Sequence, residues 1–370
     1  MHIIQSPDTP KNPNAGNTGN SGNTRKSRPL VITMGDAAGI GPEIIARAVL
    51  EQPELLQGCV VLGDVGCMRR AAGWLGRVRL PVLQLDDWAV TRADLPPRCI
   101  VVLQSGEPLP DLAPGKVHAA AGRFAGQCVL EAAQAALRGE VSAVVTAPLH
   151  KEALHAAGAP FDRYPGHTEM LQAEAAAYLG LAAADNLPVR MMLANDELRT
   201  VLVSIHVSLR RALDAVTVDN VLQTLLITHT ALSALLQRTP HIAVAGLNPH
   251  AGEGGLFGTE EADIIAPAIA AARARGCQIS GPLPPDTVFM RARHTPEHAG
   301  AFDVVVAMYH DQGLIPVKYL GVEQGVNVTL GLPFVRTSPD HGTAFDIAGT
   351  GRASAASLIA AIRMARTLAN

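Results

Sequence analysis

Short apolar runs alternate with longer helix-like segments along most of the chain. The runs at 29–36 and 59–64 each lead into a segment with helical periodicity, and Gly41 followed by Pro42 marks one helix start. We expect further strands at 141–149, 241–250 and 303–308, and helices at 41–50, 65–75, 122–139, 217–238, 259–275 and 353–368. Such alternation is typical of parallel strands joined by right-handed crossover helices. The sequence therefore predicts an α/β fold with a largely parallel sheet.

Two apolar runs, 189–195 and 198–206, follow each other with no room for a helix between them. They predict two consecutive strands, which form either a hairpin in a mixed sheet or an arm. A chain of 370 residues, 48% of them hydrophobic, can form a large α/β unit or two lobes that share one sheet. Residues 1–27 are rich in Asn, Gly, Thr and Ser and lack the apolar region of a signal peptide. We therefore expect a disordered tail followed by one folded unit, residues 28–370.

Composition argues against several classes of function. The net charge is −3 and only 4% of residues are aromatic, so neither a basic field nor base-stacking platforms for nucleic acid are expected. No apolar run reaches the ~20 residues of a membrane span. The five cysteines are widely spaced and form no C-x-x-C pair, which favours a reducing cytoplasm over a disulfide framework.

Three histidines, His206, His250 and His310, each follow a predicted strand. Because ligands of parallel sheets bind beyond the carboxyl ends of the strands, these side chains can meet at one edge. Three neutral imidazoles suit zinc or another borderline divalent ion, with a position left for substrate oxygens. The alternative is three unrelated polar loops, since no short ligand motif such as H-E-x-x-H is present.

Charged residues also occur in an otherwise apolar and Gly/Pro-rich stretch, 314–346. Lys318, Asn327 and Arg336 lie there at nearly regular intervals. A buried Lys or Arg is costly without a partner, and an anionic ligand such as a phosphate would supply one for both. Structural salt bridges are the alternative.

The glycine-rich stretch "GDAAGIG", residues 35–41, lies between a predicted strand and a predicted helix. It contains Gly39-x-Gly41, but position 44 is Ile, so the dinucleotide-binding fingerprint is incomplete. We interpret it as a tight strand-to-helix turn.

Several longer motifs occur together in one order. They are "ITMGDAAGIGPEI", "TAPLHKEALHAAG", "YPGHTEML", "GLNPHAGEGGLFGTEE", "GPLPPDTVF", "AMYHDQG" and "GLPFVRTSPDHGTAFDIAGTG". With these motifs the chain resembles the 4-hydroxythreonine-4-phosphate dehydrogenase (PdxA) family from about Pro29 to the last predicted helix. The resemblance implies a fold like isocitrate and isopropylmalate dehydrogenases, with two interleaved α/β subdomains around a central cleft. It also implies a homodimer with a shared active site.

The resemblance assigns roles residue by residue. It places divalent-metal ligands at His206, His250 and His310, and implies that His310 reaches the site of the partner subunit. It places substrate-binding residues at His167, Thr168, Lys318, Asn327 and Arg336. Asp286, Asp311 and Lys318 are the candidates for the general base. No residue is assigned to the nicotinamide cofactor.

The resemblance implies oxidation of a four-carbon 3-hydroxy acid 4-phosphate by NAD or NADP, with decarboxylation and with Zn, Mg, Mn or Co bound. Motif variants at 146–158 and 164–169 favour the branch that converts D-threonate or D-erythronate 4-phosphate to dihydroxyacetone phosphate and CO2. The alternative is the 4-hydroxy-L-threonine 4-phosphate dehydrogenases of pyridoxal phosphate (vitamin B6) biosynthesis. More distant alternatives are a phosphate acyltransferase-like enzyme and an inactive, ligand-binding relative.

Overall fold

Twelve strands form a single sheet in the computed structural model, which describes residues 28–76 and 80–369. The predicted tail, residues 1–27, lies outside the described residues. The strands are β1 (Leu30–Thr33), β2 (Cys59–Gly63), β3 (Val82–Leu85), β4 (Ile100–Gln104), β5 (Val144–Thr146), β6 (Arg190–Ala194), β7 (Arg199–Leu202), β8 (His241–Ala245), β9 (Gln278–Leu283), β10 (Val304–Ala307), β11 (Val326–Leu330) and β12 (Arg336–Pro339).

Helices connect most of these strands. The α-helices are α2 (Gly41–Glu51), α3 (Pro53–Leu56), α4 (Val65–Trp74), α5 (Ala119–Leu137), α6 (Lys151–Ala156), α7 (His167–Tyr178), α8 (Leu209–Asp214), α9 (Val218–Leu236), α10 (Ala266–Arg273), α11 (Val288–Ala292), α12 (His310–Gly321) and α13 (Ala356–Ala369). Short 3-10 helices are η1 (Phe161–Arg163), η2 (Ala184–Asn186), η3 (Pro249–Gly255) and η5 (Val322–Gln324), and η4 (Glu261–Ile265) is a π-helix. No helix in the described part of the chain has the length and hydropathy of a membrane span.

The strand order is β3-β4-β2-β1-β5-β12-β11-β6-β7-β10-β8-β9. Pairing is parallel except for β12 with β11, β11 with β6, and β6 with β7, so the expected mixed, largely parallel α/β sheet is confirmed. The two consecutive strands predicted near 190–206 form the antiparallel hairpin β6–β7, in which Met192 pairs with Val201. The predicted helix at 259–275 is instead the π-helix η4 followed by α10.

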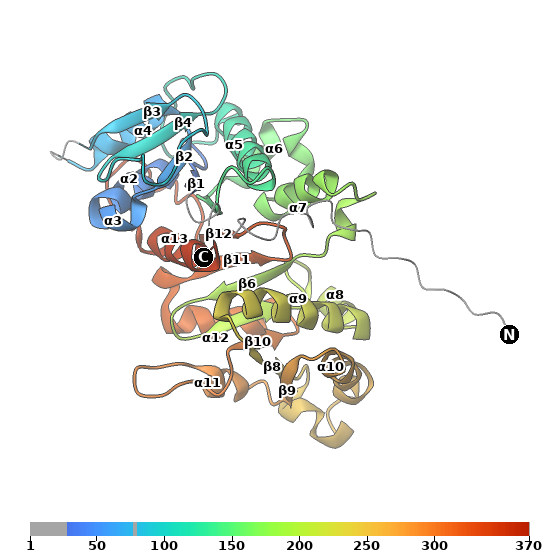
Figure 1. The fold of residues 1–370 in the computed structure, drawn as a ribbon. Helices are drawn as coiled ribbons and strands as arrows, with labels where there is room; N and C mark the ends of the chain where they lie inside the picture. Colours follow the sequence, from blue (N-terminus) through green and yellow to red (C-terminus); the bar gives the residue numbers. More distant parts are fainter. Residues whose placement is uncertain (1–27, 77–79, 370) are drawn as a thin grey trace, which may run out of the picture.

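Strands β11 and β12 join the two halves of the molecule, although they come late in the chain. In Figure 1 they lie with α13 between the upper half, built from β1–β5 and α2–α7, and the lower half, built from β6–β10 and α8–α12. β12 pairs with β5, with Arg336 opposite Val144, whereas β11 pairs with β6, with Val326 opposite Ala194. Residues from both halves therefore meet at the ends of these two strands.

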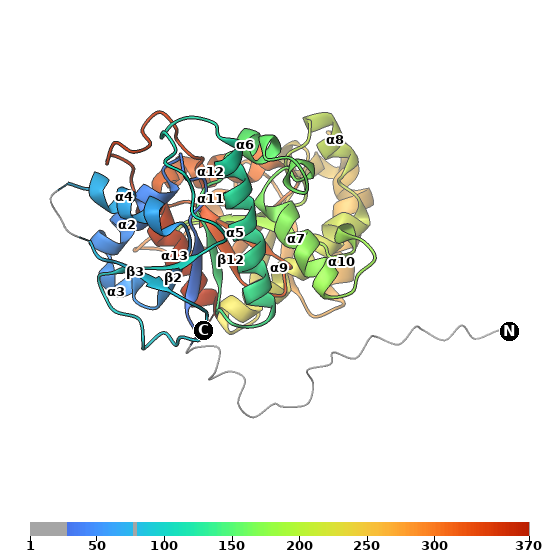
Figure 2. The ribbon, with the colours of Figure 1, turned by 90° about the horizontal axis from the view of Figure 1, so that it is seen from above.

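Apolar strands and small helix residues account for the close packing of the upper half. All four residues of β1 and all five of β2 are buried, as expected for parallel strands covered on both faces. Helix α5 is largely Ala and Gly and lies beside α6 and α7, as Figures 1 and 2 show. A Cβ on Gly122 would lie 1.9 Å from the Ala153 carbonyl oxygen, so only glycine permits the contact between α5 and α6.

A buried glutamate in α2 fixes the loop that follows β12. The Glu43 carboxylate accepts hydrogen bonds from the backbone N–H groups of Ala353 (2.8 Å) and Gly349 (3.1 Å), and its side chain has no solvent exposure. Arg47, one turn later, donates to the carbonyl of Gly351. Helix α2 thus anchors the segment between β12 and α13.

We predict that Glu43→Ala lowers the free energy of unfolding by about 2–3 kcal/mol, because two backbone donors lose their acceptor. Denaturant unfolding monitored by far-UV circular dichroism measures the effect. Glu51→Ala on the same helix is the control, since Glu51 is exposed and its one ion pair among the described residues is with Arg47, and it should change stability by no more than about 0.5 kcal/mol. Equal effects of the two substitutions would contradict the anchoring role.

Candidate functional site

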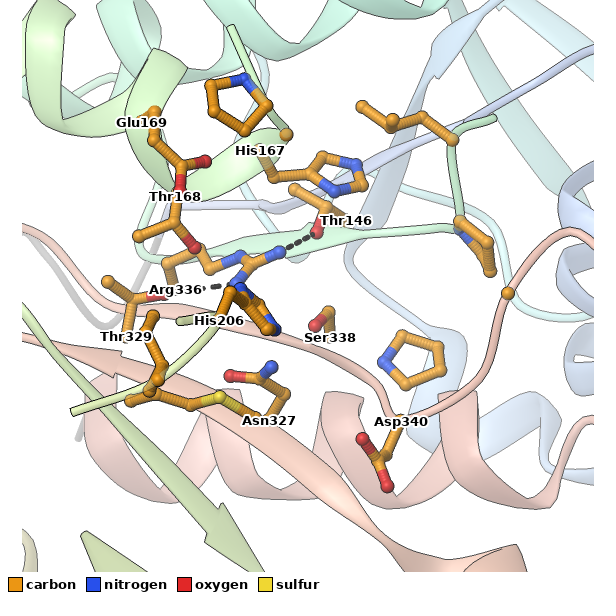
Figure 3. A pocket seen from close by; sticks show the side chains of 18 of the residues that line it. Thr146, His167, Thr168, Glu169, His206, Asn327, Thr329, Arg336, Ser338 and Asp340 are labelled. Carbon is orange, nitrogen blue, oxygen red and sulfur yellow. Dashed lines mark hydrogen bonds between the residues drawn. The ribbon is translucent and has the colours of Figure 1, made fainter. Parts of the chain in front are cut away.

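A pocket of about 420 Å³ lies where the carboxyl end of β5 meets β11 and β12 (Figure 3). Its size suits a small-molecule ligand. Polar and charged lining residues are Thr146, Lys151, His167, Thr168, Glu169, His206, Asn327, Thr329, Arg336, Ser338, Asp340 and His341. The upper half, the lower half and the joining strands all contribute to this lining, and the expected residues His167, Thr168, Asn327 and Arg336 are among them.

The alternation of side chains along β11 and β12 explains which residues reach the pocket. Asn327 and Thr329 are two residues apart on β11, and Arg336 and Ser338 are two apart on β12, so each pair lies on one face of the sheet. Thr337 between them faces α13, where its hydroxyl donates to the Ala361 carbonyl. Thr329, Ser338 and Asp340 were not predicted. Thr329 and Ser338 could have been found from the sequence, because each lies two residues after Asn327 or Arg336 and so faces the same side of the sheet.

Arg336 is a buried cation that forms no ion pair with a carboxylate in residues 28–76 and 80–369. Its side chain is 3% exposed, and it donates to the hydroxyls of Thr329 (3.0 Å) and Thr146 (2.7 Å), as Figure 3 shows. Its buried Nε–H has no acceptor within the described residues. Burial lowers the pKa of Arg336 to about 10, and Glu169 offsets this only in part. A salt bridge therefore does not explain Arg336, and an anionic ligand would.

The first turn of α7 closes the pocket on the side of the upper half. His167 and Thr168 are the first two residues of this helix, whose free backbone N–H groups and dipole favour an anion. Burial holds the pKa of His167 well below its usual 6.5, and the nearby charges of Arg336 and Lys151 lower it further. His167 is thus a neutral imidazole at physiological pH, and its buried Nε2 has no partner among the described residues.

Lys318 is held differently from Arg336. It lies on α12 and forms an ion pair with Asp340, with 2.8 Å between Nζ and Oδ2. Asp340 lines the pocket and Lys318 itself does not. Lys318 thus reaches the edge of the pocket through a salt bridge, which is the alternative that the sequence left open for this residue.

Two of the three predicted metal ligands lie side by side. The rings of His206, which lines the pocket, and His310, the first residue of α12, have centroids 5.7 Å apart. Burial lowers the pKa of His206, with Lys151 and His310 contributing, so His206 is neutral and free to bind a cation. His310 Nδ1 lies 2.7 Å from Asp311 Oδ1. Because an ionised carboxylate only accepts, Nδ1 carries the proton and Nε2 keeps its lone pair.

His250 lies apart from this pair. Its neighbours around one hollow are Asp286 and Asp311, two of the predicted general bases, whereas His206 and His310 line the adjoining hollow with Asp311. Among residues 28–76 and 80–369, no three His, Cys, Asp or Glu side chains gather as a metal site. Within the described residues, one chain therefore brings His206 and His310 together, and His250 does not join them.

The backbone around His250 is unusual. His250, Ala251 and Glu253 have φ angles of 54°, 56° and 43°, and the intervening Gly252 has 84°. A left-handed conformation costs roughly 1–2 kcal/mol for each non-glycine residue, so this turn requires support from its surroundings. The His250 ring itself touches Glu253, with 2.9 Å between Nδ1 and Oε2, which again leaves Nε2 available.

The glycine-rich stretch at 35–41 forms a tight turn, as predicted. A Cβ on Gly35 would lie 2.4 Å from the Pro148 carbonyl oxygen, and one on Gly41 would lie 2.3 Å from that of Met34. These glycines let backbone pack against backbone.

Comparison with known proteins identifies close relatives. The profile of the family described as "Pyridoxal phosphate biosynthetic protein PdxA" matches residues 55–365. A 4-hydroxythreonine-4-phosphate dehydrogenase from Beijerinckia indica subsp. indica is 50% identical over 340 residues, 92% of this chain and 95% of the relative. A D-threonate 4-phosphate dehydrogenase from Salmonella typhimurium is 46% identical over 347 residues, 93% of this chain and 100% of the relative. The crystal structure of 4-hydroxythreonine-4-phosphate dehydrogenase from Klebsiella pneumoniae matches with a TM-score of 0.79 at 43% identity, covering 93% and 100% of the two chains.

We predict that Arg336→Met leaves the ligand-free protein as stable as the wild type or up to about 3 kcal/mol more stable, because it removes a buried charge that forms no ion pair within the described residues. Inorganic phosphate should raise the unfolding midpoint of the wild type but not of the variant. Denaturant unfolding with and without phosphate measures both. Arg190→Met is the control, since Arg190 donates to Thr224, Asn220 and Gln223 and its loss should destabilise the fold. Full phosphate protection of Arg336→Met would contradict this account of the pocket.

A second prediction concerns pH. Below pH 6.5 the unfolded chain protonates His167 and the native protein does not, so stability is complete above that pH and falls as the pH decreases. Relative to His167→Gln, wild-type stability should fall by up to about 1.4 kcal/mol per pH unit below 6.5. Unfolding free energies from pH 7.5 to 5.5 in anion-poor buffer measure the difference. Parallel profiles would show that His167 titrates normally.

Proposed function

The chain belongs to the PdxA family, and we propose that it oxidises a four-carbon 3-hydroxy acid 4-phosphate, using NAD or NADP and a divalent metal ion. Its relatives are dehydrogenases of phosphorylated hydroxy acids, so the chain is an oxidoreductase of this substrate class. The main support for substrate binding in this pocket is the buried Arg336. A buried cation that has an unused N–H and no carboxylate partner in the described part of the chain is best explained by a phosphate or carboxylate that binds there.

Different lining residues would bind different groups of such a substrate. Arg336, the N–H groups at the start of α7 and the Thr168 hydroxyl bind one anionic end. Neutral His167 adds a hydrogen bond without repelling Arg336, and Asn327 adds an amide across the pocket. Lys318 is the second predicted cation, placed at the edge through Asp340.

The imidazoles suit a divalent metal ion. His206 is neutral, and on His310 and His250 a carboxylate holds Nδ1, so each ring has a nitrogen lone pair available. Three nitrogen ligands favour zinc or cobalt over magnesium. Bound here, such an ion would supply Lewis acidity at the substrate hydroxyl oxygen, and a nicotinamide would supply the hydride acceptor.

The metal site requires two copies of the chain. His206 and His310 of one protomer form a pair, and we propose that His250 of the partner subunit completes the set. This differs from the expectation that His310 crosses over. Large apolar side chains are exposed around both histidine hollows: Leu209 and Leu213 on α8, Ile315 and Tyr319 on α12, and Leu256 and Phe257 after η3. A homodimer that covers these side chains would bring the partner's His250 to the site.

The chain's own residues then act on protons. A general base removes the proton from the substrate hydroxyl as hydride leaves C3, and Asp286, Asp311 and Lys318 remain the candidates. Asp311 already accepts a hydrogen bond from His310, and Lys318 is paired with Asp340. The Asp286 side chain, beside His250, has no hydrogen bond or ion pair within the described residues. Oxidation at C3 gives a 3-keto acid, which loses CO2 because the adjacent carbonyl accepts the electron pair.

D-Threonate or D-erythronate 4-phosphate is the substrate that we propose, giving dihydroxyacetone phosphate and CO2. Apart from the Lys318–Asp340 pair, the charged lining residues are Lys151, Arg336 and Glu169, an excess of one positive charge. That excess suits a substrate with phosphate and carboxylate groups and no ammonium. The alternative substrate, 4-hydroxy-L-threonine 4-phosphate, carries an ammonium at C2, and relatives of both activities are close.

Absorbance of NADH at 340 nm tests the function directly. The purified protein is mixed with NAD or NADP, Zn²⁺, Co²⁺, Mn²⁺ or Mg²⁺, and each of the three 4-phosphates in turn. We expect a higher kcat/KM for D-threonate or D-erythronate 4-phosphate than for 4-hydroxythreonine 4-phosphate. The reverse order would assign the chain to vitamin B6 biosynthesis. No turnover with any of them would contradict the proposed function.

Mixed dimers test which histidine crosses the interface. In dimers formed from His206→Ala and His250→Ala chains, one of the two sites has all three histidines. Random mixing should therefore restore about one quarter of wild-type activity. Mixtures of His206→Ala and His310→Ala chains should stay inactive, since these residues serve the same site. Restoration by the second mixture and not the first would show that His310 is the residue that crosses.

A further inference from the structure

We propose that Glu261 is a positioning residue, which holds the left-handed turn at 250–254 and thereby fixes where His250 stands. The inference rests on the proposed function, in which His250 binds the metal ion of the partner's site. Glu261 is the first residue of the π-helix η4 and lies eleven residues after His250. A single π-turn at this point is itself a departure from regular helix of a kind common near functional sites.

The Glu261 carboxylate is bound almost entirely to the segment that leads into the turn. Oε1 accepts from the backbone N–H groups of Leu247 and Asn248, both at 2.7 Å, and Oε2 accepts from the Asn248 side-chain amide at 3.0 Å. The side chain is 5% exposed. Burial raises its pKa, but the bonds from Asn248 and Leu247 outweigh this and lower it, so the carboxylate is ionised and its bonds are charge-assisted.

The turn itself fits closely over this carboxylate. A Cβ on Gly252 would lie 2.8 Å from Glu261 Oε2, so a glycine there allows the turn to close on the acceptor. The N–H of Phe257 donates to the Gly252 carbonyl at 3.2 Å and closes the far side. Glu260 adds one more bond, from the Asn248 amide at 2.7 Å. The left-handed residues His250, Ala251 and Glu253 are thus held from outside the turn.

The position of the His250 ring depends on this backbone. The His250 side chain is 62% exposed, and the one hydrogen bond of its ring within the described residues is to Glu253, which belongs to the same turn. The Phe257 ring, which follows the same turn, lies edge-on to the His250 ring with 6.0 Å between the centroids. Loss of the Glu261 bonds would therefore change the place of His250 far more than it would change the sheet, and metal binding is the property that reports it.

The experiment measures the dissociation constant for Zn²⁺ of the metal-free dimer, by competition with a chromophoric chelator, together with its oligomeric state. We expect Glu261→Ala to weaken Zn²⁺ binding by about 10–100-fold, the usual effect of removing a group that orients a ligand. Glu43→Ala is the matched control: it also removes a buried carboxylate that accepts from two backbone N–H groups, but in the other half of the molecule. Its Zn²⁺ dissociation constant should stay within about twofold of wild type.

A compensating substitution separates positioning from a general loss of stability. Glycine adopts a φ near 56° at little steric cost, so Ala251→Gly makes the left-handed turn easier to form without adding a contact. In the Glu261→Ala background it should recover Zn²⁺ affinity by about fivefold. If Glu261→Ala gives no folded dimer, Glu261→Gln serves instead, since it keeps Oε1 as an acceptor and places its amide against the Asn248 amide. The expected loss is then smaller and Ala251→Gly should still reduce it.

Zn²⁺ binding by His250→Ala is measured alongside, because it tests the metal site separately from the positioning role of Glu261. If His250→Ala leaves Zn²⁺ affinity unchanged, the metal site of the proposed function is wrong. If His250→Ala weakens binding while Glu261→Ala does not, or if Glu43→Ala weakens it as much as Glu261→Ala, the positioning role of Glu261 is overturned. A loss in Glu261→Ala that Ala251→Gly reduces supports it.

Discussion

Pairing of β11 and β12 between the two halves of the sheet is the constraint on which the rest of the structure depends. Hydrogen bonds from β12 to β5 and from β11 to β6 make one continuous sheet from two sets of parallel strands. The same pairing places Arg336 and Asn327 opposite the start of α7, which belongs to the upper half. The pocket exists because these two strands, which follow the lower half in the sequence, lie at the centre of the sheet.

Two features of the site lower the stability of the fold and are expected to favour ligand binding. Arg336 is buried beside a neutral His167, and the charge of Glu169 offsets that burial only in part, so a bound anion would stabilise the guanidinium. The turn at His250 adopts a left-handed conformation that non-glycine residues disfavour, and Glu261 supports it. Local preference is overridden in each case at a residue with a proposed role, where an unfavourable arrangement is expected.

Much of the architecture could be read from the sequence, because its signals are local. Apolar runs followed by helical periodicity predicted β1, α2, β2 and α9, and adjacent runs predicted the hairpin β6–β7. Strands β11 and β12 were not predicted: both are short, Arg336 and Pro339 interrupt the apolar pattern of β12, and the partners β6 and β5 lie far away in the chain. Nor does any sequence pattern show that His206 and His310 meet within one chain, or that backbone near His250 is left-handed. Asp340 was missed because its partner, Lys318, is 22 positions earlier and on another element.

The central claim is a pocket for a phosphorylated hydroxy acid beside a metal ion held by two subunits. Anomalous diffraction at the zinc absorption edge, from crystals of the Zn²⁺-loaded protein, tests it most directly. The account predicts one strong peak for each protomer, within bonding distance of His206 and His310 of one chain and His250 of the partner subunit. A peak bound by residues of a single chain, or no peak near these histidines, would contradict it.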